Sequence, residues 1–411
     1  MAAGLLGQGS TDLEHRGYEI FFPVIISAIS GQPLSAQARA LYDPALLPGM
    51  TALARRHDLT HLLALGLKNN GPLDEQSREL ETEMFRAAFR CEQLSYELER
   101  ICRTFEDAQI PFIPLKGSVL RPYYPEPWMR TSCDIDVLVR EQDLDRAIAA
   151  LSKTLSYQIG EISLHDVQIR TPNGQHIELH RNLIEDHRVN RAAEVLASVW
   201  DTAAPRSGWT YWLEMPDELF YFYHIAHMAK HLDNGGCGIR PFLDIWVLTH
   251  RVPYDPEKRK QLLADGGLTE FASQAERLTE VWFGAAAHDD ATRRLERYIL
   301  IGGVYGTADN KMSVQQARSG GKLRYACSRI WLPYEKLKTH YPSLDGRPAL
   351  LPLYEIYRWG RLLFCGGVTR SVTELRINNS IGKERAEEAG RLFSELGLHK
   401  DTEKQKTNAN S

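Results

Sequence analysis

The sequence has few cysteines, little imbalance of charge and no long hydrophobic run. Its six cysteines are scattered over 411 residues without a CxxC pair, which argues against a zinc knuckle or a disulfide-bonded scaffold and favours reduced thiols. Because the chain has 53 acidic and 49 basic residues, it has no overall basic field that would indicate nucleic-acid binding. With 43% apolar and 25% charged residues, the composition is that of an ordinary folded protein.

Segments that direct a chain into a membrane or out of the cell are also lacking. The first residues contain no basic stretch followed by an apolar one, so we expect no signal peptide. The apolar run from Ile20 to Ile29 is shorter than the roughly 20 residues that cross a bilayer. A second apolar segment, Leu350 to Val368, is interrupted by Arg358 and Arg361. We therefore expect a cytoplasmic protein without a membrane partner.

Hydrophobic spacing divides the chain into two helical flanks and a short α/β centre. Over about residues 34–104, apolar residues recur at spacings of three and four residues. This pattern predicts antiparallel helices, the last of them long and charged. Short β-like runs then alternate with helical segments, and the pattern is helical again beyond Ala192. The predicted fold class is α+β, with these parts: an N-terminal helical region (1–104), an α/β core (105–191), a C-terminal helical domain (192–399) and a disordered tail (400–411).

Two of the short runs, Val167–Ile169 and Ile177–Leu179, flank a turn that contains Gly174. A two-residue Asn-Gly loop would place Ile169 opposite Glu178, whereas a three-residue loop places Ile169 opposite Ile177. The parity of the side chains therefore predicts a hairpin with a three-residue loop. Gly174 is expected in the left-handed conformation, which glycine adopts without a Cβ clash.

The chemistry of the chain is concentrated in the centre, beginning with Lys116-Gly117-Ser118 and the run Asp134-Ile-Asp136. Side chains two apart on a strand share a face, so Asp134 and Asp136 point the same way. Two carboxylates that close repel one another unless a divalent cation lies between them, and oxygen ligands favour Mg²⁺ or Mn²⁺. Gly117 and Ser118 lie where a strand gives way to a helix, a place that can hold a phosphate. Taken alone, the first motif also fits an ordinary turn and the second a solvated edge strand.

A third carboxylate is expected on a neighbouring strand, and Glu178 of His176-Ile-Glu-Leu-His180 supplies one. If Ile177 and Leu179 face the core, then His176, Glu178 and His180 face the other way. The alternative is a polar strand face with an exposed glutamate.

These residues resemble the nucleotidyltransferase superfamily that includes DNA polymerase β, whose signature is a Gly-Ser turn, an Asp-x-Asp strand and a later acid. More narrowly, LKGSVLRPYYPEPWMRTSCDIDVLV followed by IELH is similar to a bacterial family of uncharacterised nucleotidyltransferases. The motif match covers about residues 110–182. Lys116 stands where the superfamily usually has an apolar residue, as it does in the narrower family.

The resemblance implies a small mixed sheet and a site for nucleotidyl transfer. Asp134 and Asp136 are expected to hold Mg²⁺ or Mn²⁺, with Glu178 as the third acid, which binds a metal or accepts a proton. The expected contacts to the phosphates of a nucleoside triphosphate (NTP) are made by residues of the turn and by one arginine: Lys116, Gly117, Ser118 and Arg130.

A second group of candidate residues lies on one predicted helix. His224, His227 and His231 are spaced at i, i+3 and i+7, and Asp244 follows on the next helix. The three histidines, together with His180, are candidates for lining the substrate site. Neutral imidazoles with a carboxylate also bind zinc or iron, as in metal-dependent phosphohydrolases, although the HExxH motif is absent. The third interpretation is that these histidines are structural.

Three functions are compatible with these patterns. The leading hypothesis is a Mg²⁺-dependent nucleotidyltransferase that moves a nucleoside monophosphate from an NTP to a hydroxyl of an acceptor. That acceptor is a small molecule, a peptide or protein, or a tRNA, of which the near-neutral charge disfavours tRNA. The alternatives are a metal-dependent phosphohydrolase centred on the histidine helix and a non-catalytic nucleotide-binding module.

Overall fold

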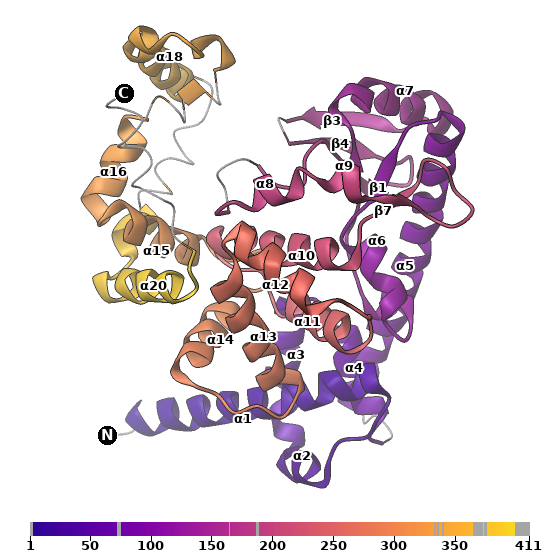
Figure 1. The fold of residues 1–411 in the computed structure, drawn as a ribbon. Coiled ribbons are helices and arrows are strands. Elements are labelled where there is room, and N and C mark those ends of the chain that lie inside the picture. Colours follow the sequence, from indigo (N-terminus) through magenta and orange to yellow (C-terminus); the bar gives the residue numbers. More distant parts are fainter. Residues whose placement is uncertain are drawn as a thin grey trace.

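The structure is a computed structural model, and most of the chain is described by it. The described residues are 3–71, 75–163, 165–185, 189–332, 334, 337–338, 341–364, 373 and 376–398. They form a small mixed sheet surrounded by helices, which confirms the predicted α+β class (Figure 1). The expected disordered tail, 400–411, lies outside the described residues.

The N-terminal helices pack tightly around the apolar run of the first helix. They are α1 (Ala3–Ser30), α2 (Ala36–Leu41), α3 (Leu47–Arg56) and α4 (Thr60–Lys68). Ile20 and Ile29 are buried, so the run between them serves as protein core. Helix α4 approaches α1 so closely that a Cβ on Gly66 would lie 2.0 Å from the carbonyl oxygen of Val24. This contact is possible because residue 66 is a glycine.

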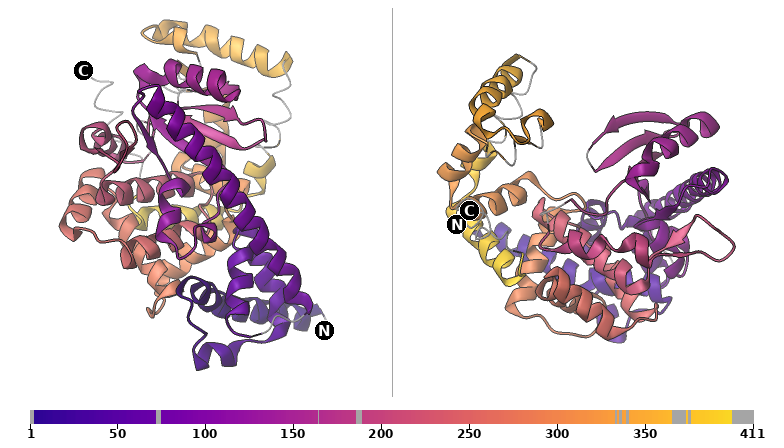
Figure 2. Two further views of the ribbon diagram at one scale, coloured as in Figure 1. Left: turned by 90° about the vertical axis from the view of Figure 1, so that its right-hand side faces the viewer. Right: turned by 45° about the horizontal axis from the view of Figure 1, so that its top comes forward.

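A single long helix, α5 (Glu75–Asp107), connects these helices to the sheet (Figure 2). Near its start, Leu80 belongs to the core of the helical part. Near its end, Ile101 and Phe105 pack with the buried side chains of the sheet. The helix therefore fixes the sheet relative to the N-terminal helices, because it contributes side chains to both cores.

The sheet has five strands in the order β1-β2-β5-β4-β3. Strands β2 and β5 pair in parallel and the other neighbours are antiparallel. The strands are β1 (Phe112–Pro114), β2 (Asp134–Val139), β3 (Gln158–Ile162), β4 (Asp166–Arg170) and β5 (His176–His180). After β1 comes the short α6 (Gly117–Leu120), and α7 (Leu144–Leu155) joins β2 to β3.

The β4–β5 hairpin confirms the predicted register. Ile169 is paired with Ile177. The backbone N–H of Thr171 donates to the carbonyl of Gln175 at 3.0 Å, which leaves three residues in the loop. Gly174 has φ of 86°, in the left-handed region as expected.

The two faces of the sheet differ in chemistry because side chains alternate along each strand. One face is apolar and packs against α5 and α7 through residues such as Ile135, Val137 and Ile177. The opposite face carries Asp136 and Glu178 and is turned toward α10 (Asp217–Asp233). The site therefore lies between the polar face of the sheet and one helix.

The remaining helices complete the C-terminal part. They are α8 (Ala192–Leu196), α9 (Val199–Thr202), α11 (Arg240–His250), α12 (Pro256–Gly266), α13 (Thr269–Phe283), α14 (Asp290–Gly302), α15 (Ala308–Ser319), α16 (Lys322–Ile330), α18 (Leu351–Phe364) and α20 (Lys383–Glu395), with a two-stranded ribbon of β6 (Ala204–Pro205) and β7 (Leu213–Glu214). Helices α10 to α14 share one continuous core with the N-terminal helices, although the sequence places the two groups far apart. Within the described residues, no helix is sufficiently long and apolar to span a bilayer.

The close contact between α1 and α4 leads to a test with a matched control. We expect Gly66→Ala to lower the free energy of unfolding by roughly 1–3 kcal/mol, because the added methyl group must displace backbone. The control is Gly49→Ala in α3, where a Cβ has no neighbour within 4 Å among the described residues. For Gly49→Ala we expect the free energy of unfolding to rise by about 0.5–1 kcal/mol, because alanine favours a helix more than glycine does. Urea unfolding measures both, and equal effects in the two variants would contradict this packing.

Candidate functional site

Lys116 occupies the turn between β1 and α6 in an unusual backbone conformation. Its φ of 48° and ψ of −119° lie where residues other than glycine rarely occur. The next residue, Gly117, packs so closely on Ser132 that a Cβ there would lie 3.2 Å from the serine side chain. Strained residues of this kind cost about 1–3 kcal/mol and are concentrated at functional sites. The turn directs the Lys116 ammonium group to the polar face of the sheet.

Asp136 and Glu178 are paired in register on the parallel strands β2 and β5. The ammonium group of Lys116 lies 2.7 Å from Asp136 Oδ1 and 3.9 Å from Glu178 Oε2. His180 Nε2 lies 2.8 Å from the same Asp136 oxygen and 3.4 Å from Glu178 Oε2. Two acids from separate parts of the sequence thus share one lysine and one histidine.

The environment of Asp136 strongly favours its ionised form. Burial, which leaves only 2% of the residue exposed, opposes ionisation, but the Lys116 charge and the His180 hydrogen bond outweigh it. The pKa of Asp136 is therefore held far below its usual value. Burial lowers the pKa of His180, but its hydrogen bonds to Asp136 and Glu178 outweigh burial, so the pKa is raised.

Asp134 lies at the start of β2, two residues before Asp136. Burial and the negative charge of Asp136 raise its pKa, and Lys116 only partly compensates. The two aspartates therefore repel one another, as expected for a carboxylate pair.

Three side chains of this group are placed to hold a cation. Asp136, Glu178 and His180 each offer a ligand atom within 4.8 Å of the others. The two carboxylates suit Mg²⁺ or Mn²⁺ and so fit the predicted ion, whereas His180 Nε2 donates to Asp136 and is not an oxygen ligand. Asp134 is not in this group, and its part as a ligand stays a prediction.

A cavity of about 380 Å³ opens in front of these residues. It is lined from the sheet side and from α10 by Lys116, His165, Asp166, Glu178, His180, Leu183, Tyr223, His227, Lys230 and His231. Sequence reasoning missed His165, Asp166, Tyr223 and Lys230. The hairpin register contained a signal for Asp166, which pairs with His180. Lys230 is three residues from His227 and so lies on the same helix face.

A family model described as "Uncharacterised nucleotidyltransferase" matches residues 47–284, more than half of the chain. The chain belongs to this nucleotidyltransferase family. No curated protein and no solved structure shows a significant match to it. The matched residues include the long helix α5, the whole sheet, α10 and α11, so the family segment contains both sides of the cavity.

Helix α10, which carries the three histidines, contributes to the cavity only in part. His227 and His231 line it, with 3.2 Å between their Nε2 atoms. His224 Nε2 instead lies 3.0 Å from the carbonyl oxygen of Pro241. Burial lowers the pKa of all three, to about 4 for His231, so they are neutral at pH 7. Within the part of the chain that the structure describes, they form no metal-binding group with Asp244.

Asp244 and Arg130 form a buried ion pair away from the carboxylates of the candidate site. Arg130 Nε donates to Asp244 Oδ1 at 2.6 Å, and the hydroxyl of Tyr124 donates to the same oxygen at 2.7 Å. Burial opposes both charges, but the pairing raises the pKa of Arg130 and lowers that of Asp244. The structure thus gives Arg130 a partner on α11, and a phosphate contact by this residue stays a prediction.

Gly117 and Ser118 lie directly beside Lys116 but do not line the cavity. The backbone N–H of Ser118 donates to the carbonyl of Leu115 at 3.1 Å. Its hydroxyl oxygen is buried and has no hydrogen-bond partner among the described residues. A buried hydroxyl without a partner has a proton to donate, and the contact of Ser118 with a phosphate stays a prediction.

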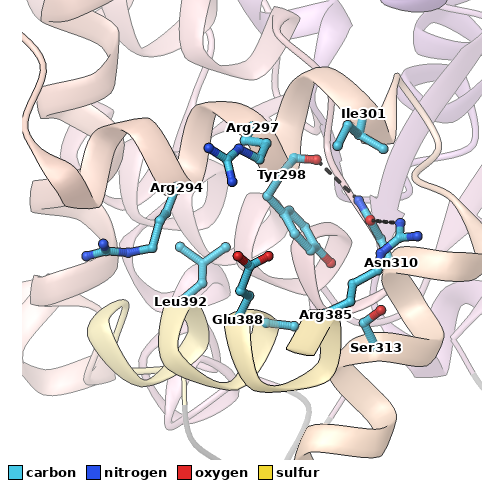
Figure 3. A pocket seen from close by; sticks show the side chains of 10 residues that line it. Arg294, Arg297, Tyr298, Ile301, Asn310, Ser313, Arg385, Glu388 and Leu392 are labelled. Atoms are coloured by element: carbon cyan, nitrogen blue, oxygen red, sulfur yellow. Dashed lines mark hydrogen bonds between the residues drawn. The ribbon is translucent and has the colours of Figure 1, made fainter. Parts of the chain in front are cut away.

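Another cavity, of about 530 Å³, lies between α14, α15 and α20 (Figure 3). It has three arginines in its wall, but Arg294 is bonded to Glu395 at 2.9 Å and Arg385 to Asp309 at 3.2 Å. Its lining residues lie outside the family match, and the carboxylates described above are not among them. The cavity beside Asp136 is therefore the candidate site that lies within the family match.

The ion pair of Arg130 provides a test of its role. We expect Arg130→Gln to lower the free energy of unfolding by about 3–5 kcal/mol, because it leaves the Asp244 carboxylate buried without its cation. The control, Arg293→Gln, changes an exposed arginine of α14 and should alter the free energy of unfolding by less than roughly 0.5 kcal/mol. Urea unfolding of both variants measures this. Unchanged stability with weakened nucleotide binding would instead assign Arg130 to the phosphates.

Proposed function

We propose that this protein is a Mg²⁺-dependent nucleotidyltransferase that transfers a nucleoside monophosphate from an NTP to a hydroxyl of an acceptor. The observation that carries the proposal is the meeting of Asp136 with Lys116 and Glu178, of which Lys116 and Glu178 line one cavity and Asp136 is buried behind them. The family membership supports the general activity. Mg²⁺, the NTP and the acceptor are part of the proposal.

The reaction builds negative charge on the phosphate that is attacked and on the pyrophosphate that leaves. Asp134, Asp136 and Glu178 would hold Mg²⁺ or Mn²⁺, which supplies positive charge to the phosphate oxygens. Lys116 and Lys230 reach the cavity from opposite sides and add two further cations. Lys116 is already fixed by its turn, so little reorganisation is needed when the phosphates bind.

Glu178 is the best-placed group to accept the proton of the attacking hydroxyl. Its side chain is 23% exposed and lines the cavity, whereas Asp136 is almost completely enclosed. A general base must reach the substrate, and this exposure lets Glu178 do so. His227 and His231, neutral at pH 7, form the facing wall and can donate or accept hydrogen bonds to the acceptor.

The acceptor is a small molecule, a peptide or protein, or a tRNA. A formal charge of −4 provides no long-range attraction for tRNA, so the first two are favoured. We place the reaction in the cytoplasm, where NTP and Mg²⁺ are present. Of the alternative functions, the phosphohydrolase loses support because His224 and Asp244 have other partners.

Transfer of label from α-³²P NTPs tests the proposal. The protein is incubated with each of four NTPs, Mg²⁺ and fractionated cell extract, and labelled products are separated by size. We expect Asp134→Asn and Asp136→Asn to reduce transfer by about 100-fold or more, because each removes charge that holds the metal. Asp145→Asn, an exposed acid on α7, is the matched control and should retain transfer.

Two outcomes would count against nucleotidyl transfer. Label transfer that survives the combined Asp134→Asn and Asp136→Asn changes would show that the carboxylates are not the catalytic groups. Stoichiometric NTP binding without turnover in any fraction would instead favour the non-catalytic nucleotide-binding module.

A further inference from the structure

A second group of potential metal ligands lies along the same cavity, on the β4–β5 side. His165, Asp166 and His180 each offer a ligand atom within 4.8 Å of the others. Asp166 and His180 are paired across the two strands, and the rings of His165 and His180 are 5.1 Å apart. This group contains two imidazoles and one carboxylate, and all three residues line the cavity.

His180 has one ring nitrogen in use and one without a partner. Its Nε2 faces Asp136 at 2.8 Å, so this nitrogen carries a proton and donates it to the carboxylate. Its Nδ1 is buried and has no hydrogen-bond partner in the described part of the chain, and the residue is only 3% exposed. A buried polar atom without a partner needs one, which a bound ion or an ordered water would supply. An imidazole that donates one N–H to a carboxylate is also the usual arrangement of a metal-bound histidine.

His165 is oriented in a corresponding way. Its Nδ1 is hydrogen-bonded to Asn182 Oδ1, an acceptor, so Nδ1 carries the proton and Nε2 keeps its lone pair. Lys230 Nζ approaches Nε2 at 3.4 Å but has Glu185 as a closer partner, at 2.9 Å. Asp166 is oriented too, since its Oδ1 accepts from the Ser163 hydroxyl at 2.8 Å.

We propose that His165, Asp166 and His180 bind a divalent transition-metal ion of the zinc class, at a site separate from that for Mg²⁺. Two imidazoles and one carboxylate suit zinc, cobalt or iron, whereas Mg²⁺ prefers oxygen ligands alone. Each of the three residues has a hydrogen-bond partner that orients it. Asp136 stays the partner of His180 Nε2, so the ion leaves that bond intact.

Such an ion would act on the catalytic carboxylate through His180. With Nδ1 bound to the metal, His180 keeps its Nε2 proton and its orientation toward Asp136. His180 is then a positioning residue for Asp136, and the zinc-class ion is structural. The proposal does not depend on nucleotidyl transfer, because binding of the ion is measurable without a substrate.

Cobalt titration of the full-length protein provides the test. The protein is treated with a chelator, dialysed, and titrated with Co²⁺ in the presence of excess Mg²⁺, while visible absorption is recorded. We expect about one Co²⁺ per chain in a site with nitrogen ligands, displaced by Zn²⁺ but not by Mg²⁺. His165→Ala and, independently, the isosteric Asp166→Asn should each weaken Co²⁺ binding by roughly tenfold or more.

Two further variants make the result specific. His250→Ala removes a histidine of α11 whose side chain is 42% exposed and should leave the absorption unchanged. Glu178→Gln removes an acid of the proposed Mg²⁺ site and should also leave it unchanged. Far-ultraviolet circular dichroism checks that all variants are folded. The proposal is overturned if Co²⁺ binds equally well to His165→Ala and Asp166→Asn, or if Glu178→Gln alone abolishes the signal, which would place the ion among the acids.

Discussion

The arrangement of the site depends on one buried carboxylate, that of Asp136. An ionised group this deeply enclosed is costly unless other charges and hydrogen bonds compensate for the loss of water. Lys116 and His180 supply that compensation from β1–α6 and from β5. Because each of the three groups needs the others, the turn after β1 and the two parallel strands are held in a defined relation. The strain at Lys116 is tolerated since its side chain secures this pairing.

The helices around the sheet decide what else reaches Asp136. Helix α5 belongs to both hydrophobic cores and so holds the sheet against the helical part. Helix α10 lies across the polar face and brings Tyr223, His227, Lys230 and His231 to the cavity. The result is a small space that has acids, Lys116 and two histidines on the sheet side, and Lys230 with two neutral imidazoles on the α10 side. This distribution suits a substrate that carries phosphates together with a divalent ion.

His180 connects two different chemistries. Nε2 is turned to Asp136, and Nδ1 has no hydrogen-bond partner among the described residues and lies on a residue grouped with His165 and Asp166. A hard-cation site and a borderline-metal site can therefore lie next to each other without sharing a ligand atom. The imidazole-rich metal site that the sequence suggested on α10 is thus proposed at the β4–β5 hairpin instead, because His224 has a backbone partner and Asp244 has Arg130.

Local rules were sufficient for several features. Side-chain alternation along a strand follows from covalent geometry. It predicted that Asp134 and Asp136 share a face and that Ile177 faces away from Glu178. It also predicted the three-residue loop of the hairpin. Tertiary structure alone decided which partners those faces met. Nothing local to Arg130 reveals that its guanidinium is buried against Asp244, 114 residues away, and nothing local to Lys230 places it near His165. Such pairings are set by how α10 and α11 pack on the sheet, since long-range burial determines which charges must be neutralised together.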